Sequence, residues 1–286
     1  MARTSIATTD VLTWEAAIDS LRPDPLWAAS ERLLEGSELK HGISFSRLFE
    51  VLNTAWIQVI GNGSRTPQFE DLQRYYSHPA WLINAAYIES DPLAIADRSA
   101  AVRLVQHVAP RRVLDFGGGL GTVSRLCARH FPSEVEIDLL DVSAFQTTAR
   151  SRLAEFRNIR VVEEPVPPYD AVICTEVLEH VLDPLGVVKT INSLLRPGGA
   201  FAASWSFAPG LDCHLPQNFH LNQAMLWIVR ALGFGFYGFE RRGSTVYSFV
   251  KTNNITSRHS AAASLLELLA RIHFPLNRLL CALRGI

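Results

Sequence analysis

The stretch VLDFGGGLGTVSRL, residues 113–126, joins an apolar run and an aspartate to a cluster of glycines and a helix-like segment. Gly117, Gly119 and Gly121 permit tight turns and leave the backbone open to close approach by a ligand. A strand, such a turn and then a helix are typical of a nucleotide-binding site, although glycine-rich turns also simply pack a strand against a helix. Asp141 lies twenty residues after Gly121, at the end of the next apolar run. At that spacing a carboxylate accepts hydrogen bonds from ribose hydroxyls, so the pattern predicts an adenosine-containing cofactor.

The aspartate two residues before the first of these glycines, Asp115, indicates which cofactor this is. The turn of NAD enzymes points the N-terminus of its helix at a pyrophosphate. A carboxylate inside the turn would repel that group, but it can organise the loop around the ammonium of an amino-acid end. The pattern Asp-x-Gly-x-Gly-x-Gly therefore favours S-adenosylmethionine over NAD.

The elements that must position these residues begin near residue 92, where apolar strand-like runs start to alternate with helical segments. The runs are RRVLDFG, VEIDLLDV, IRVVEE, YDAVICT, GAFAASW, GFYGFERR and STVYSFVK. They predict an α/β fold with a mostly parallel, doubly wound sheet of seven strands, whose last two runs form an antiparallel pair at one edge. We expect a helical lid or substrate region at 1–91, a cofactor-binding domain at 92–252 and an amphipathic helical tail at 253–286.

Two further segments follow the glycine turn: YDAVICTEVLEHVLDP at 169–184 and LLRPGGAFAASW at 194–205. Together these motifs make residues 92–252 resemble the class I, Rossmann-like S-adenosylmethionine-dependent methyltransferases. The pattern is most like the small-molecule group that includes the ubiquinone-biosynthesis O-methyltransferases. The resemblance implies S-adenosylmethionine as cofactor, S-adenosylhomocysteine as product and a small-molecule acceptor methylated on oxygen or nitrogen. The cofactor-binding residues expected from the motifs and this resemblance are Asp115, Gly117, Gly119, Gly121, Asp141, Val142, Glu164, Thr175, Glu176 and Tyr76.

Two members of that set rest on weaker signals. The family has an acidic residue after the third strand that contacts the adenine; here VVEEPVPPYD is short, and either Glu163 or Glu164 can serve or simply solvate a strand end. Tyr76 belongs to an aromatic group in residues 75–87 that reads either as helix core or as a lid over the cofactor. Because Tyr75 and Tyr76 are adjacent, both cannot face the core of one helix, and at least one is expected to line the cleft.

Histidines after the fourth and fifth strand-like runs are candidates for a general base. Methyl transfer from a sulfonium is an in-line displacement in which a hydroxyl or amine acceptor must lose a proton, and imidazole titrates near neutrality. His180 and His220 are equal candidates for the base, with His214 third; the alternative for His180 is a structural hydrogen bond. We predict no metal site, because His214 and His220 are irregularly spaced on a loop.

Composition limits the other function classes. The chain has 286 residues, and its net charge of −1 supplies no field for nucleic acid, which disfavours an RNA methyltransferase. A protein or RNA methyltransferase and a non-catalytic cofactor-binding module remain as alternatives. Four dispersed cysteines, no apolar leader and no long apolar run predict a cytoplasmic protein without a transmembrane segment. The leucine-rich tail predicts packing on the body, a homodimer contact or a peripheral membrane contact, with Pro275 kinking or dividing the helix.

Overall fold

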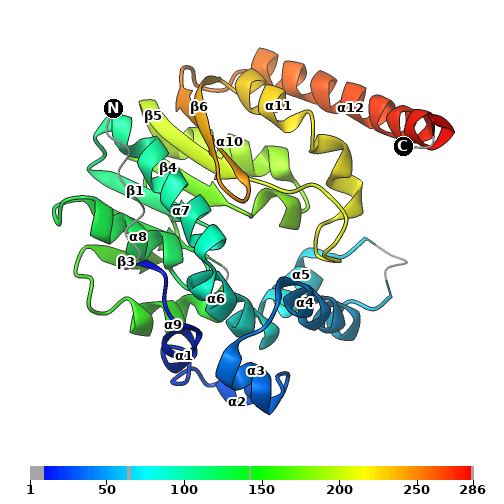
Figure 1. Cartoon of the computed structure of the whole chain (residues 1–286). Coiled ribbons are helices and arrows are strands. Elements are labelled where there is room, and N and C mark those ends of the chain that lie inside the picture. The colour runs from blue at the N-terminus through cyan, green and yellow to red at the C-terminus, as the bar shows by residue number, and fades with distance from the viewer. Residues whose placement is uncertain (1–9, 63–65, 142, 285–286) are drawn as a thin grey trace.

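The structure is a computed structural model that describes residues 10–62, 66–141 and 143–284. Its centre is a seven-stranded sheet in the order β3-β2-β1-β4-β5-β7-β6 (Figure 1). The strands are β1 (Arg112–Phe116), β2 (Glu136–Leu140), β3 (Ile159–Val162), β4 (Tyr169–Thr175), β5 (Leu195–Ser204), β6 (Phe234–Arg241) and β7 (Thr245–Lys251). Strands β1 to β5 are parallel, whereas β7 pairs antiparallel with both β5 and β6. The predicted fold, including the antiparallel edge pair, is confirmed.

Helices cover both faces of the sheet, because the central strands are apolar on both sides. One face packs on α7 (Pro92–Val105), α8 (Thr122–His130) and α9 (Ser143–Arg152). The other packs on α10 (Pro184–Leu194) and α11 (Met225–Ala231). Short 3-10 helices η2 (Gln106–Val108), η3 (Leu178–His180) and η4 (Pro216–Leu221) connect these elements. All residues from Ala171 to Cys174 in β4 are fully buried, as expected for a central parallel strand.

The N-terminal part of the chain is helical, as predicted. It comprises α1 (Trp14–Asp19), α2 (Trp27–Glu31), α3 (Gly36–His41), α4 (Phe45–Val59), α5 (Phe69–Tyr76) and α6 (Ala80–Ser90). Ser44 caps α4 by accepting a hydrogen bond from the Arg47 N–H at 3.1 Å. Leu48 and Leu52 of α4 then share one helix face and pack in a core with Tyr75 of α5. Figure 1 shows these helices grouped at one end of the sheet, with α6 and α7 leading into it.

A buried carboxylate joins the N-terminal helices to the rest of the molecule. Glu89 of α6 is 1% exposed. It accepts a hydrogen bond from the Thr122 hydroxyl at 3.1 Å, lies 3.5 Å from the Arg125 guanidinium, and is paired with Arg152. Since Thr122 and Arg125 belong to α8 and Arg152 to α9, this cluster fixes α6 against the helical layer of the sheet.

The C-terminal tail is one helix, α12 (Ser257–Arg284), which continues through Pro275. Of the two outcomes predicted for Pro275, a kink or a division, the division is excluded; one missing backbone N–H leaves the many other hydrogen bonds of a long helix in place. Ala263 is buried and Leu266 packs on the core beside α11, whereas Leu265 and Leu268 are exposed. Within the described residues, no helix is both long and apolar enough to cross a membrane.

Candidate active site

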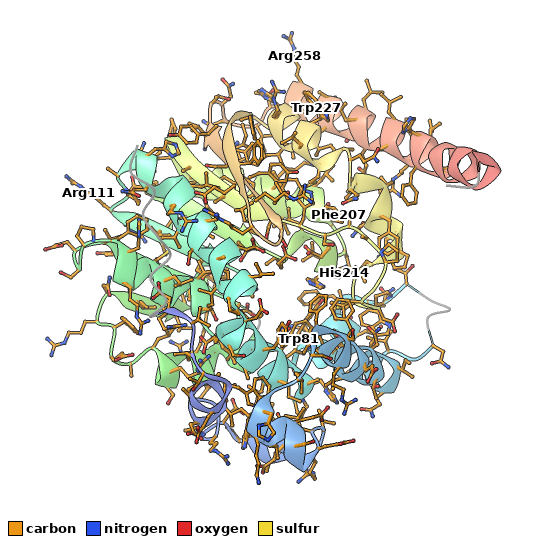
Figure 2. All side chains as sticks on the ribbon, viewed as in Figure 1. Trp81, Arg111, Phe207, His214, Trp227 and Arg258 are labelled. Atoms are coloured by element: carbon orange, nitrogen blue, oxygen red, sulfur yellow. The ribbon has the colours of Figure 1, made fainter. Side chains whose placement is uncertain are left out.

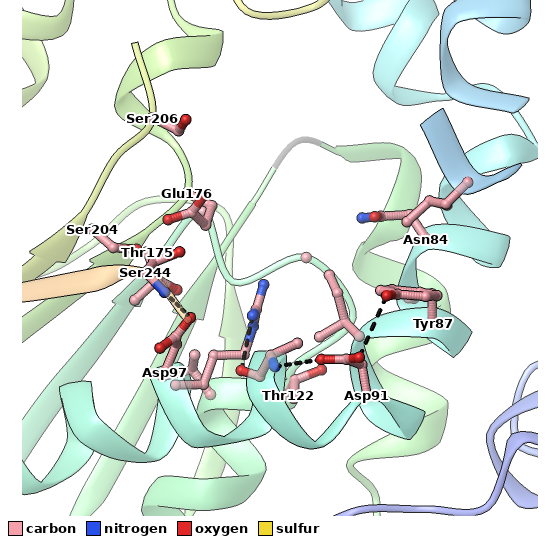
Figure 3. A pocket seen from close by; sticks show the side chains of 18 of the residues that line it. Asn84, Tyr87, Asp91, Asp97, Thr122, Thr175, Glu176, Ser204, Ser206 and Ser244 are labelled. Atoms are coloured by element: carbon pink, nitrogen blue, oxygen red, sulfur yellow. Dashed lines mark hydrogen bonds between the residues drawn. The ribbon is translucent and has the colours of Figure 1, made fainter. Parts of the chain in front are cut away.

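A cavity of about 690 Å³ lies between the carboxyl edge of the sheet and the N-terminal helices. Figure 3 shows Thr175, Glu176, Ser204 and Ser206 on one side and Asn84 and Tyr87 on the other. Figure 2 shows the two parts of the chain meeting there, with Trp81 from α6 and His214 from the loop after β5. The lining thus combines polar groups of the sheet edge with aromatic groups of the helices.

The glycine turn forms part of this lining. Gly119 has a φ of +55°, and the position of its missing Cβ has no atom within 4 Å, so the backbone is open to the cavity. A Cβ on Gly118 would lie 2.6 Å from the Asp115 carboxyl group, so only glycine fits between that carboxylate and the cavity. The turn therefore presents bare backbone to a ligand, as the sequence predicts.

Asp115 supports the turn from inside the protein. It is 2% exposed, and its Oδ2 accepts hydrogen bonds from the Ser124 N–H at 2.9 Å and the Ser124 hydroxyl at 2.7 Å. Burial raises the pKa of Asp115 from 3.8 to about 7, against the effect of the Ser124 bonds. The carboxylate thus ties the end of β1 to the first turn of α8 and holds the loop in shape.

Asp141 follows β2 and contacts the same loop, since its Oδ2 accepts a hydrogen bond from the Gly119 N–H at 2.5 Å. The carboxylate and the bare turn predicted from the sequence are therefore adjacent. Val142, the next predicted residue, lies outside the described residues. Glu164 is exposed after the end of β3 and is not among the residues that line the cavity.

Thr175 ends the central strand β4, Glu176 follows it, and both line the cavity. Glu176 has a φ of +55°, which is costly for a residue with a side chain. Its Oε1 is buried and has no hydrogen-bond partner. Strained backbone and unsatisfied polar atoms in native proteins concentrate at functional sites. Glu176 is therefore a candidate functional residue at the carboxyl edge of the sheet.

Two of the three predicted histidines meet at the cavity. His180 and His214 both line it, and their ring centroids are 4.9 Å apart. Burial, with the neighbouring His214, lowers the pKa of His180 to about 3, and burial also lowers the pKa of His214. His220 is elsewhere: its Nε2 lies 3.5 Å from Oε1 of Glu267 on α12, outside the cavity lining.

The segment that carries these site residues matches a known protein family. A family model described as a methyltransferase domain matches residues 91–235. The chain belongs to this family. The matched segment begins at Asp91, which caps α7, and contains the glycine turn, Asp141, Glu176 and both cavity histidines.

Curated relatives of this methyltransferase domain match about half of the chain or less. The ubiquinone biosynthesis O-methyltransferase of Burkholderia ambifaria (strain MC40-6) is 30% identical over 158 residues, which cover 52% of this chain and 66% of the relative. The enzyme of that name from Xanthomonas campestris pv. campestris (strain B100) is 38% identical over 101 residues, covering 32% of this chain and 42% of the relative. The chain thus spans less than two thirds of the length of these relatives.

Solved structures extend the likeness in fold beyond the methyltransferase domain. Human N-acetylserotonin methyltransferase in complex with SAM has a TM-score of 0.51 at 16% identity, covering 88% of this chain and 76% of that one. The mitomycin 7-O-methyltransferase MmcR has a TM-score of 0.52 at 15% identity, covering 82% and 74%. At such identities the likeness concerns the fold alone.

The sequence analysis missed several polar residues that line the cavity, among them Arg98, Asp97, Ser204 and Ser244. Arg98 of α7 lines the methyltransferase cavity, and its Nη1 donates a hydrogen bond to the Ala94 carbonyl at 3.1 Å. Burial lowers the pKa of its guanidinium, while nearby Glu176 and Asp97 oppose that effect. Arginines are frequent on helices, so an arginine alone does not indicate a site. The only feature of the sequence that could have indicated Arg98 is its place on the helix that precedes β1 and the glycine turn.

The two adjacent tyrosines occupy different environments beside the methyltransferase domain. Tyr75 is fully buried, and its hydroxyl donates to the Leu52 carbonyl at 3.2 Å. Tyr76 packs with its ring centroid 6.0 Å from that of His180 and 4.9 Å from that of Trp81. Tyr76 therefore lies behind two residues of the lining and is not part of the lining itself.

Proposed function

We propose that this chain transfers a methyl group from S-adenosylmethionine to a small-molecule acceptor. The observation that carries the proposal is a single cavity with two unlike walls. One wall is the bare glycine turn, which accepts support from Asp141 through the Gly119 N–H although Asp141 is not itself in the lining, and the other is aromatic. A nucleoside and an apolar acceptor can therefore be held next to each other, which is the requirement for direct transfer between them.

The residues present fit this cofactor. The open backbone at Gly119 accommodates close contact, and the Asp141 carboxylate is suited to ribose hydroxyls. Arg98 can pair with the carboxylate of an amino-acid end, because a guanidinium forms strong charge-assisted hydrogen bonds with that group. When bound, S-adenosylmethionine supplies an electrophilic methyl group on a sulfonium.

The helical region before the domain supplies the acceptor side of the proposal. Phe45 and Phe49 of α4, Trp81 and Tyr87 line the cavity. Rings of this kind bind flat apolar molecules and exclude water. Residues 1–91 therefore act as a lid and as the part that selects the acceptor, and His180 and His214 receive its reacting group.

Calorimetry with S-adenosylmethionine, S-adenosylhomocysteine and NAD tests the cofactor. We expect binding of the first two and none of NAD. Asp141→Ala should weaken binding by roughly 1.5–3 kcal/mol, since hydrogen bonds to a charged group are lost. Glu134→Ala, which removes an exposed carboxylate between α8 and β2, is the matched control and should bind normally. Binding of NAD alone, or equal affinity in both variants, would contradict the proposal.

The proposal includes a second copy of this chain as partner of α12. Leu265, Leu268, Leu269 and Ile272 are each more than half exposed and share one helix face. Such a row is self-complementary across a two-fold axis. Arg271, the charge beside it, is paired with Glu267, which leaves little attraction for an anionic membrane. Sedimentation should give a dimer for the wild type and a monomer for Leu268→Glu; binding of the wild type to anionic vesicles instead would contradict this assignment.

A further inference from the structure

Three side chains with metal-ligand atoms converge at the edge of the cavity. One ligand atom each from Glu179, His180 and His214 lies within 4.8 Å of the other two. We propose that these three residues bind a first-row divalent cation, for which zinc is the best match. The site deepens the proposed function and rests on it, because the ion would act on the acceptor.

The orientation of both imidazoles favours ligation. The Nδ1 atom of His180 faces the Cys213 carbonyl at 3.3 Å, and that of His214 faces the Ala208 carbonyl at 2.9 Å. A carbonyl only accepts, so Nδ1 must carry the hydrogen in each ring, and Nε2 is left with its lone pair. Metal-binding histidines are commonly fixed in this way by a backbone carbonyl.

Glu179 supplies a second, independent observation. It is fully buried, and its Oε1 accepts a hydrogen bond from the Ser206 N–H at 3.0 Å. Its Oε2 is also buried but has no partner. An unsatisfied buried carboxylate oxygen is costly, and a cation between it and the two Nε2 atoms would satisfy all three acceptors at once.

The surroundings suit a dication. The neighbouring Glu176 has its Oε1 buried without a hydrogen-bond partner, and burial of Glu179, together with this neighbouring carboxylate, raises the pKa of Glu179 well above its usual value. Two carboxylates this close repel each other, and a dication bound to Glu179 would offset that repulsion.

The ligand set indicates which ion fits. Two imidazoles and one carboxylate suit zinc, whereas magnesium and calcium prefer oxygen ligands alone. With zinc–ligand distances near 2.1 Å, the ligand atoms of a tetrahedral site are roughly 3.4 Å apart. Since the three ligand atoms already lie within 4.8 Å of one another, they need to approach by at most about 1.4 Å to reach that spacing. Rotation of His214, which lies on an irregular loop, can supply this movement.

Three protein ligands leave one position of the ion open, and His180 and His214 line the cavity. An acceptor hydroxyl bound at that position loses its proton more readily, because the cation stabilises the oxyanion. The proton passes to solvent. The oxygen–carbon bond then forms as the sulfur–carbon bond breaks, and the sulfonium becomes a neutral thioether.

Titration of chelator-treated full-length protein with Zn²⁺ and Co²⁺ tests the site. We expect one ion per chain and visible Co²⁺ absorption typical of four or five nitrogen and oxygen ligands. Glu179→Gln and His214→Asn should each weaken binding at least 10-fold. His41→Asn, which alters an exposed histidine at the end of α3, is the matched control and should bind as the wild type does. Mg²⁺ should bind more weakly than Zn²⁺.

Equal Zn²⁺ affinity in the wild type and both site variants would overturn the inference, as would a Co²⁺ spectrum of a hexa-aqua ion in the wild type. The spectrum decides the matter even where a variant fails to fold. S-adenosylhomocysteine binding is measured on the same samples. If the wild type binds S-adenosylhomocysteine but no metal, only the metal site is rejected. If the wild type does not bind S-adenosylhomocysteine, the proposed function is rejected.

Discussion

At the scale of single residues, Glu176 lowers the stability of the fold while it serves the proposed site. Its left-handed backbone costs about 1–2 kcal/mol, and its buried Oε1 is unsatisfied. Glu176→Gly removes both costs but adds about 0.5–1 kcal/mol of chain entropy to the unfolded state. We therefore expect the free energy of unfolding in urea to rise by about 1 kcal/mol, while methyl transfer and cofactor affinity fall.

Ala109 offers a matched control for this substitution. It follows η2 with a φ of +43°, is exposed and lies outside the cavity lining. Ala109→Gly should relieve similar backbone strain without changing cofactor affinity. If Glu176→Gly also kept full cofactor affinity, the Glu176 carboxylate would have no part in cofactor binding.

Asp115 provides a residue-scale prediction in pH. Its folded-state pKa of about 7 lies above the ordinary value of 3.8, so between these values the folded state holds a proton that the unfolded chain has released. The stability from this group is complete below about pH 4 and is lost as the pH rises to 7. The wild type should therefore lose unfolding free energy relative to Asp115→Asn as the pH rises from about 4 to 7. Above pH 7 the difference between the two proteins should stay constant. Parallel curves in urea would mean that the Ser124 bonds keep the carboxylate ionised.

At the scale of elements, α6 is attached through Glu89. The side chains of Arg125 and Arg152 are each 10% exposed, and that of Glu89 is 2% exposed. Glu89→Ala leaves two buried guanidiniums without their carboxylate, which should cost about 3–5 kcal/mol in urea unfolding. Glu31→Ala removes the carboxylate of the exposed pair with Arg22, and should cost no more than about 1 kcal/mol. Equal losses in the two variants would show that Glu89 does not hold α6 in place.

The elements also show where sequence reasoning works. The strands and the glycine turn were predictable because short apolar runs and turn residues act locally. The environment of α6 was not, because Leu82, Ile83, Ala85 and Ala86 are buried between two layers and leave no polar face. Whether Pro275 kinks or divides α12 could not be decided from the sequence, because the outcome depends on the long run of helix formers around that one residue, and the helix continues.

At the scale of the whole molecule, the sequence located one side of the candidate site better than the other. Asp141 and the turn follow successive strands, so their proximity comes from the parallel sheet itself. The approach of His214 to His180, and the separation of His220 from both, depend on an irregular loop that has no periodic signal. Arg98 enters the cavity through tertiary packing of α7, which local pattern does not encode.

The cavity has one wall from the N-terminal helices and one from the sheet, so a ligand that fills it binds only when both parts are folded and docked. S-adenosylhomocysteine at about 100 times its dissociation constant should then stabilise the molecule by about 2.7 kcal/mol. S-adenosylhomocysteine should therefore slow the hydrogen exchange of globally protected amides in both α4 and β1, by a factor that corresponds to the same free energy. NAD should slow exchange in neither element. Slowing in β1 without any in α4 would mean that the helical region folds independently of the cofactor site. In that case the proposed lid would have to be abandoned, although the methyltransferase domain would still bind its cofactor.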